Sequence, residues 1–280
     1  MVPPGVALED RGSRLALVVG SGRVVDRQVE SFLKVFPDAI VFSWRSRPIA
    51  GRRPLSASSW RAVAEQLKAA GVTDVVHFGM MSPGDIVRHL FGGLGPILLK
   101  ALGKRGGLID DVMRPYAQAL ADAGVTPQSH SRLLPHYAVG AGLITPSNGQ
   151  AEDVARYALL AGHVAPQAWF RLAERQPRFA VSQAVLFEGG RLVAQERRGT
   201  DALLLWAARR RPRAQRVLVK LRPPQQPVGL DPPVIGVRTI KNAAQARVSL
   251  IILDAKDGVI LDRSDTLDTA RSLGVSIVGV

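Results

Sequence analysis

The sequence has no cysteine among its 280 residues. Disulfide bonds, thiolate metal ligands and cysteine nucleophiles are therefore excluded, which fits a cytoplasmic location. Aromatic residues make up only 5% of the chain. No apolar run approaches the ~20 residues that a membrane-spanning helix needs. The first residues also lack the apolar core of a secretory signal, so we expect a protein of the cytoplasm, with peripheral contact to the inner membrane face as an extension.

Positive charge is abundant, with a formal net charge of +14. Nucleic acid, an anionic bilayer surface or a phosphorylated ligand would each complement such a charge. The densest basic cluster follows an apolar, helix-like segment and consists of Arg209, Arg210, Arg211, Arg213 and Arg216. No stacking aromatics interleave with these arginines and no known nucleic-acid-binding motif accompanies them. We therefore expect a solvated face or membrane-surface contact, and no nucleic-acid binding.

The first half of the chain alternates apolar strand patterns with helical periodicity, which predicts a parallel sheet with ligands beyond the carboxyl ends of its strands. The expected strands are Leu15–Val19, Ile40–Trp44 and Val75–Phe78, and the expected helices are Val24–Val35, Ser59–Ala70 and Ile109–Ala123. Glycine turns follow the first and third strands, at Gly20-Ser21-Gly22 and at Gly79. Such turns suit a phosphate at a helix N-terminus, although the missing third glycine leaves an ordinary tight turn as the alternative.

Beyond Val125 the pattern changes to short polar segments with several prolines. His130 and His136 lie there, and without a carboxylate partner we interpret them as bystanders and not as metal ligands. We predict an N-terminal domain with a parallel sheet at residues 1–137, a linker at 138–150 and a C-terminal α+β domain at 151–280. The fold class is thus α/β.

The second half combines a hairpin signal with helices. Strands Ala180–Phe187 and Leu192–Glu196 flank Glu188-Gly189-Gly190, and Gly199-Thr200-Asp201 then opens a helix. The further strands expected are Arg216–Lys220, Val234–Val237, Leu250–Leu253, Val259–Leu261 and Ser276–Val278, and the helices are Ala151–Ala161, Ala202–Ala208, Ile240–Ala246 and Thr266–Leu273.

A proline-rich stretch, KLRPPQQPVGLDPPVIG, connects two of these strands over Lys220–Gly236. Its five prolines restrict the backbone and remove N–H donors, so it cannot be an interior strand. The stretch holds two cations, Lys220 and Arg222, and a single carboxylate, Asp231. By itself it is compatible with either a surface connector or a functional loop.

The order of these segments resembles a known family. SQAVLFEGGRLVAQERRGTDALL (Ser182–Leu204), followed by the loop with Asp231-Pro232-Pro233 and Gly236, resembles the LpxI-type UDP-2,3-diacylglucosamine pyrophosphatases of lipid A biosynthesis. The resemblance implies that the N-terminal domain is Rossmann-like and that the ligand is held in a cleft between the two domains. It also implies magnesium-dependent hydrolysis of UDP-2,3-diacylglucosamine to UMP and 2,3-diacylglucosamine 1-phosphate. The implied partners are this acylated nucleotide sugar, the inner-leaflet membrane surface and, as an open alternative, a second copy of the chain in a homodimer.

The resemblance also implies roles for individual residues. Asp231 corresponds to the aspartate on which the family's activity depends, and Asp201 and Asp231 are the candidate magnesium ligands. The candidate substrate-binding residues are Gly20, Ser21, Gly22, Gly79, Gln183, Glu196, Gly199, Thr200, Lys220 and Arg222. Their chemistry agrees, because pyrophosphate hydrolysis needs cations to neutralise phosphate oxygens and a carboxylate to hold metal or orient water. Magnesium is satisfied by one or two carboxylates together with phosphate and water.

Three positions depart from the family pattern. The family commonly has a glutamate, an arginine and a leucine where this chain has Arg198, Gly229 and Pro232. These departures motivate an alternative, a homologue that binds a nucleotide-lipid or a lipid phosphate without turning it over. A nicotinamide-dependent oxidoreductase, suggested by the first glycine turn alone, is a further alternative.

Overall fold

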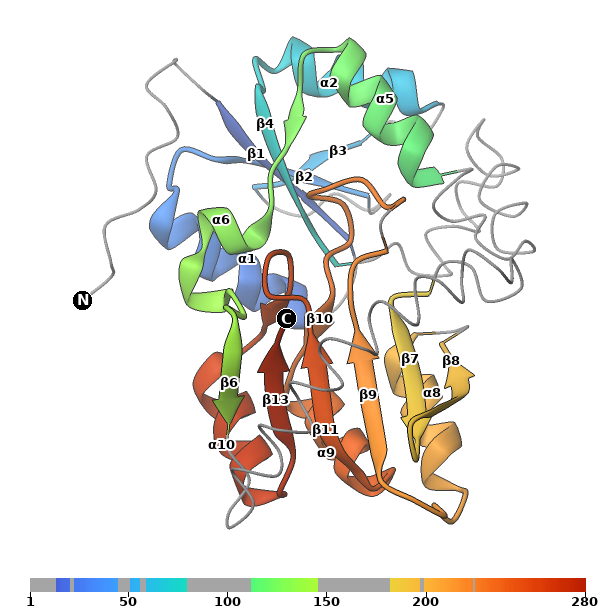
Figure 1. Cartoon of the computed structure of the whole chain (residues 1–280). Helices are drawn as coiled ribbons and strands as arrows, with labels where there is room; N and C mark the ends of the chain where they lie inside the picture. The colour runs from blue at the N-terminus through green and yellow to red at the C-terminus, as the bar shows by residue number, and fades with distance from the viewer. Residues whose placement is uncertain are drawn as a thin grey trace. The chain divides into compact units, whose positions relative to one another are not determined.

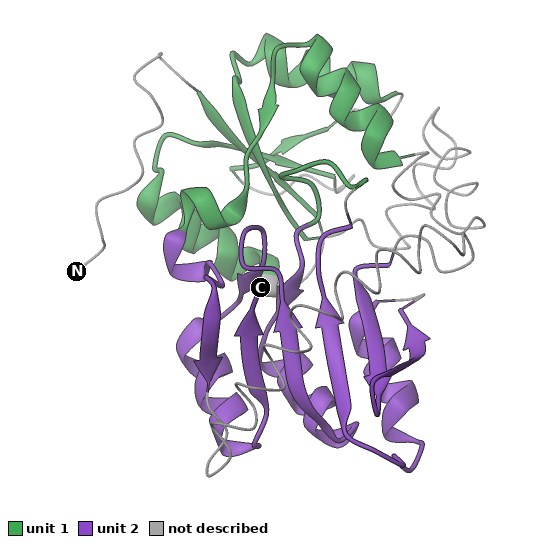
Figure 2. Ribbon diagram, in the orientation of Figure 1, with its two compact units in different colours: residues 1–134, 225–231 green, residues 135–224, 232–280 purple. Residues whose placement is uncertain are grey.

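The computed structural model describes residues 14–20, 23–44, 51–55, 59–79, 112–145, 182–196, 199–223 and 225–280. The chain divides into two compact units (Figure 2). Unit 1 comprises residues 1–134 and 225–231, and unit 2 comprises residues 135–224 and 232–280. The expected helix Ala151–Ala161 lies outside the described residues. Among the residues described, no helix is both long and apolar enough to cross a membrane.

Unit 1 contains a five-stranded parallel sheet of order β3-β2-β1-β4-β5 (Figure 1). The strands are β1 (Leu15–Val19), β2 (Ile40–Ser43), β3 (Arg53–Pro54), β4 (Asp74–Phe78) and β5 (Thr126–Pro127). The central strand β1 is buried along its whole length, as in parallel sheets covered on both faces. The predicted parallel sheet is confirmed. Its strand order reverses between β1 and β4, the kind of switch point where such sheets bind ligands.

The helices of unit 1 are α1 (Arg23–Val35), α2 (Trp60–Ala69), α5 (Arg114–Asp122) and the short α6 (His130–Leu133). Helix α2 begins at a capping residue, because Ser59 Oγ accepts a hydrogen bond of 3.0 Å from the backbone N–H of Ala62. It ends before Gly71, whose φ of +76° is the left-handed conformation expected of a glycine after a helix. Both boundaries agree with the prediction.

Unit 2 contains a six-stranded mixed sheet of order β6-β13-β11-β9-β7-β8 (Figure 1). Its strands are β6 (Gly142–Thr145), β7 (Ala184–Glu188), β8 (Arg191–Gln195), β9 (Arg216–Lys220), β11 (Val248–Leu253) and β13 (Ser276–Gly279). The hairpin β7–β8 is confirmed. The prediction of an α+β half did not anticipate the parallel centre formed by β9, β11 and β13. Strand β6, in the predicted linker, pairs antiparallel with β13.

Helices α8 (Thr200–Ala208), α9 (Val237–Gln245) and α10 (Arg263–Ser272) lie behind this sheet in Figure 1. Their inward side chains, including Leu204 and Ile240, form one buried cluster with Leu218 of β9. The neighbouring Val217 and Val219 belong to a second buried cluster, because side chains alternate between the two faces of a strand.

The chain after β9 differs from its predicted course. The expected strand Val234–Val237 is the two-residue β10 (Val234–Ile235), paired with β12 (Val259–Ile260), and Val237 already begins α9. Residues 225–231, which contain Asp231, belong to unit 1 although the flanking residues belong to unit 2. The proline-rich stretch therefore contributes its middle segment to unit 1 and its two flanking segments to unit 2.

Candidate functional site

Several predicted site residues of unit 2 lie at one edge of the six-stranded sheet. Strand β9 ends at Lys220, which pairs with Ala184 at the start of antiparallel β7 and with Leu253 at the end of parallel β11. Strand β8 ends beside the start of β7, since Val185 pairs with Gln195. Residues just outside these strand ends must therefore meet at the same edge.

Four of them form a hydrogen-bonded group, the Lys220 cluster, which consists of Gln183, Glu196, Thr200 and Lys220. Lys220 Nζ donates to Thr200 Oγ1 at 2.8 Å, and Thr200 Oγ1 donates to Glu196 Oε2 at 2.8 Å. The other carboxylate oxygen, Glu196 Oε1, accepts the backbone N–H of Gln183 at 3.1 Å. The structure thus brings together four residues that are up to 37 positions apart in the chain.

The charge of Lys220 is buried, because only 6% of the residue is exposed to solvent. Within the described part of the chain it forms no ion pair, and Glu196 reaches it only through the Thr200 hydroxyl. An ammonium group has three donors; Thr200 takes one, and Gln183 Oε1 accepts a longer bond of 3.5 Å. Burial of a cation is unfavourable unless it is paired. The Lys220 cluster therefore favours an anion beside Lys220 Nζ.

The N-terminus of α8 adds to this preference. Gly199 occupies the N-cap position with φ +91°, a conformation that favours glycine, and no side chain caps the helix. Thr200 is the first helical residue. Backbone N–H groups in a first helical turn have no intrahelical partner, and the positive end of the helix dipole attracts anions. Lys220 and the start of α8 are therefore a combined candidate site for a phosphate group.

Asp201, a predicted magnesium ligand, connects two helices. Its Oδ2 atom pairs with Arg238 Nε at 2.6 Å and its Oδ1 atom accepts Asn242 Nδ2 at 3.1 Å. The Arg238 side chain is 86% exposed, and such surface ion pairs contribute at most about 1 kcal/mol. Among the described residues, no group of three or more His, Asp or Glu side chains could hold a metal ion.

Arg222, a predicted phosphate clamp, lies beside two acids that sequence reasoning missed. Its Nε atom pairs with Asp257 Oδ2 at 2.5 Å, and its backbone N–H donates to Asp254 Oδ2 at 3.1 Å. Asp254 Oδ1 also accepts the backbone N–H of Lys256 and of Asp257, both at 2.9 Å. An aspartate directly after the buried strand β11 was the available signal, because ligands gather at the carboxyl ends of parallel strands.

In unit 1, two predicted glycines follow the strands on either side of the switch point. Gly20 comes directly after β1, and its N–H donates to the carbonyl of Phe78 at 2.8 Å. Gly79 comes directly after β4 and has φ +73°. Ser21 and Gly22, predicted to complete the first turn, lie outside the described residues.

Asp231 lies at the end of the unit 1 segment 225–231, which buried Gln226 holds in shape. Gln226 Nε2 donates to the carbonyls of Leu230 and Asp231, each at 2.6 Å. Asp231 has φ +51°, in the left-handed region that aspartate adopts more often than most residues other than glycine. We retain Asp231 as a candidate because of its carboxylate chemistry.

Gly229 fixes how this segment sits on unit 1. It has φ +78°, and a Cβ atom there would lie 2.9 Å from the backbone C and O atoms of Pro127. Such a contact requires the backbone to move, so only glycine suits the observed conformation. The glycine at this position, where the family commonly has an arginine, is thus required by the local packing.

A buried pair of histidines lies beneath the segment. His77 Nε2 and the Tyr116 hydroxyl are 2.9 Å apart, and the His130 ring contacts the Phe78 ring edge-on with centroids 4.4 Å apart. Burial lowers the pKa of His77 from 6.5 to about 3 and that of His130 to about 4. Both rings are therefore neutral near pH 7. Sequence reasoning did not single out His77, because one histidine within an apolar strand carries no motif.

Comparisons with known proteins find similarity mainly in the second half of the chain. Residues 167–278 match the family model described as LpxI C-terminal domain. The chain is 38% identical over 104 residues to a Caulobacter vibrioides protein named UDP-2,3-diacylglucosamine pyrophosphatase LpxI. That match covers 35% of this chain and spans 37% of the length of the relative. A short-chain dehydrogenase/reductase superfamily protein from Agrobacterium tumefaciens with bound NAD is similar at 22% identity, with a TM-score of 0.24, over 49% of this chain and 38% of that protein.

Proposed function

We propose that the chain hydrolyses the pyrophosphate of UDP-2,3-diacylglucosamine to UMP and 2,3-diacylglucosamine 1-phosphate, because residues 167–278 match the family model described as LpxI C-terminal domain. The observation that carries the proposal is the Lys220 cluster. Its buried lysine lies beside a helix N-terminus, and both lie inside the region that matches the family. A pyrophosphate is the kind of concentrated anion that these groups would stabilise.

The proposed site residues have two roles, which are phosphate binding and catalysis of the hydrolysis. Lys220 and the N–H groups at the start of α8 bind a phosphate, Thr200 and Glu196 orient the lysine, and Gln183 holds Glu196. Gly20 and Gly79 have no side chains, so a ligand can approach the protein backbone closely at the carboxyl ends of β1 and β4. Asp231 orients the attacking water.

Magnesium is part of the proposal, and Asp201 and Asp231 are each a candidate for a carboxylate ligand. Carboxylate oxygens suit this ion, which takes one or two of them and completes its shell with phosphate oxygens and water. When bound, magnesium would neutralise charge that develops on the pyrophosphate. Asp201 must release Arg238 to take this role, and the high exposure of that arginine makes the release inexpensive. The acylated substrate resides in a bilayer, so we place the chain at the cytoplasmic membrane face.

The test is release of UMP from UDP-2,3-diacylglucosamine by the purified chain with magnesium. Asp231→Ala should abolish turnover while circular dichroism and the thermal midpoint stay near wild type. Asp265→Ala, which removes an exposed acid in the first turn of α10, is the matched control and should retain the wild-type rate. Absence of UMP at high enzyme concentration, with intact substrate recovered, would contradict the proposal.

A second function is favoured by Gly229, which has no room for the arginine that the family commonly carries there. Loss of that cation suits a protein that binds a nucleotide-lipid or lipid phosphate without hydrolysing it. Calorimetry with 2,3-diacylglucosamine 1-phosphate separates the two functions. Tight binding that depends on Lys220, with wild-type turnover no faster than that of Asp231→Ala, would identify a binding protein.

A further inference from the structure

A basic surface with an exposed apolar edge lies at the end of unit 2 where α8 and α9 finish. We call it the arginine face, and it consists of Leu205, Trp206, Arg209, Arg210, Arg211 and Arg247. It lies at the C-terminal end of α8, whereas the Lys220 cluster lies at the N-terminal end of the same helix. The proposed phosphate site therefore does not account for these arginines.

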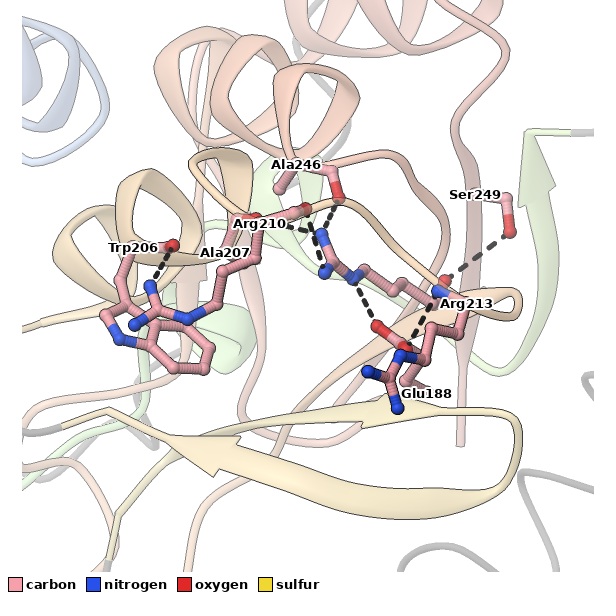
Figure 3. A network of polar contacts seen from close by, with 8 residues as sticks. Glu188, Trp206, Ala207, Arg210, Arg213, Ala246 and Ser249 are labelled. Atoms are coloured by element: carbon pink, nitrogen blue, oxygen red, sulfur yellow. Dashed lines mark hydrogen bonds and ion pairs between the residues drawn. The ribbon is translucent and has the colours of Figure 1, made fainter.

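A buried arginine fixes the scaffold beneath this face. Arg216, only 3% exposed, donates through Nη1 to the carbonyl of Ala207 at 2.9 Å and to that of Ala246 at 2.8 Å. These carbonyls lie at the ends of α8 and α9, which Arg216 thus holds together. Glu188 neutralises Arg216 through an ion pair of 2.8 Å and also accepts the backbone N–H of Arg213 (Figure 3). The network around Arg216 is satisfied within the protein.

The arginines of the arginine face are not paired within the protein in the way that Arg216 is. A pocket of about 300 Å³ opens between the two helix ends, and its lining includes Arg209, Arg210, Arg211 and Arg247. Within the described ranges, the side chains of Arg209, Arg211 and Arg247 make no hydrogen bond or ion pair, and no carboxylate lines the pocket. Four arginines therefore line a single concavity, and their positive charge calls for an anion.

The apolar edge indicates which anion. Leu205 and Trp206 are 47% and 39% exposed, and the exposure of such large apolar side chains to water is unfavourable. The guanidinium of Arg210 lies 3.9 Å from the centre of the Trp206 ring and hydrogen-bonds to the Trp206 carbonyl (Figure 3). This arginine covers one ring face, which disfavours stacking on a nucleic-acid base. Tryptophan and leucine beside several arginines are instead typical of surfaces that enter the headgroup region of a membrane.

We propose that the arginine face is a docking surface for an anionic phospholipid bilayer. The arginines bind lipid phosphates, one of them inside the pocket, while Leu205 and Trp206 enter the interface between headgroups and acyl chains. The inference does not require catalysis, because docking is measured without substrate. It gives a physical reason for placing a chain without a described membrane-spanning helix at a membrane.

The test is co-sedimentation of the full chain with vesicles of phosphatidylglycerol and phosphatidylcholine, against vesicles of phosphatidylcholine alone. We expect binding to the anionic vesicles only, weakening as salt is raised. Arg209→Ala with Arg211→Ala should lower the partition coefficient roughly 30-fold, from the typical contribution of each arginine near an anionic surface. The matched control is Lys241→Ala with Arg271→Ala, which removes two exposed cations elsewhere on unit 2 and should bind like wild type.

Trp206 provides a second readout. Lipids brominated along the acyl chain should quench part of the tryptophan fluorescence of the wild type, and Trp206→Phe should lose that component. Equal binding to neutral and anionic vesicles, or an equal loss in both double variants, would overturn the proposal. So would arginine-dependent binding to single-stranded RNA without vesicle binding, which would assign the face to nucleic acid.

Discussion

Mild acid should destabilise unit 1 through its buried histidine pair. Between pH 6.5 and about 4, the unfolded chain binds protons at His77 and His130 while the folded chain keeps both rings neutral. A depressed folded pKa means that the full stability is present above pH 6.5 and is lost as the pH falls through this window. For a fall from pH 7 to pH 5, linkage gives a loss of about 2 kcal/mol for each histidine, hence about 4 kcal/mol for the pair.

Urea unfolding at the two pH values, followed by tryptophan fluorescence, measures this loss. Trp44 and Trp60 are buried in unit 1, with ring centroids 6.2 Å apart, so they report its unfolding. His130→Phe removes one titrating group and keeps the edge-on ring contact with Phe78. The loss in this variant should be smaller than that of the wild type by about 2 kcal/mol, because other groups that titrate are common to both proteins and cancel in the difference. An undiminished loss in His130→Phe would refute the assignment of the acid sensitivity to this pair.

Three further predictions concern individual side chains. Lys220→Met should preserve the fold but weaken phosphate-ligand binding by at least ~100-fold, since a charge-assisted contact to a phosphate is lost; calorimetry measures this, and unchanged affinity would place the phosphate elsewhere. Arg216→Leu should lower the unfolding free energy of unit 2 by about 3–5 kcal/mol in denaturant titration, because Glu188 and the helix-end carbonyls lose their donor, and a loss below about 1 kcal/mol would contradict that role. Gly229→Ala should lower the free energy of unfolding by at least about 1 kcal/mol, owing to its positive φ and its contact with Pro127, and a stabilised variant would be inconsistent with the observed segment.

The sequence predicted best those elements whose patterns are strictly local. Strands β1 and β9 have the predicted bounds because the first is a wholly apolar run and the second is an apolar core of three residues bounded by Arg216 and Lys220. The start of α9 was missed, since Val234–Val237 around a glycine has the composition of a strand, whereas Val237 is helical. Local composition does not record that Gly236 is the residue before this helix.

The site residues were harder to predict because their partners depend on strand pairing. Thr200, Glu196 and Lys220 were grouped through a family resemblance, and no spacing rule would have brought them together. The ion pair of Arg222 with Asp257 exists because β9 and β11 are parallel neighbours, a pairing that was not predicted. Asp231 was singled out as a carboxylate in a stiff loop, and its role stays a prediction. Its place in unit 1 could not be inferred, since the segment 225–231 is flanked on both sides by residues of unit 2.

The two proposed functions can be separated because removal of the Lys220 side chain and removal of the Asp231 side chain should have different effects. Lys220 is a buried cation whose described partners are a hydroxyl and an amide oxygen, so its removal acts on the affinity for the anion in the ground state. Asp231 is a half-buried carboxylate that would repel a phosphate, so its removal should leave binding measured without magnesium unchanged or tighter, and should lower turnover. An enzyme must show both effects. A protein with only the Lys220 effect would be the binding homologue, with Gly229 marking where the catalytic arrangement was lost.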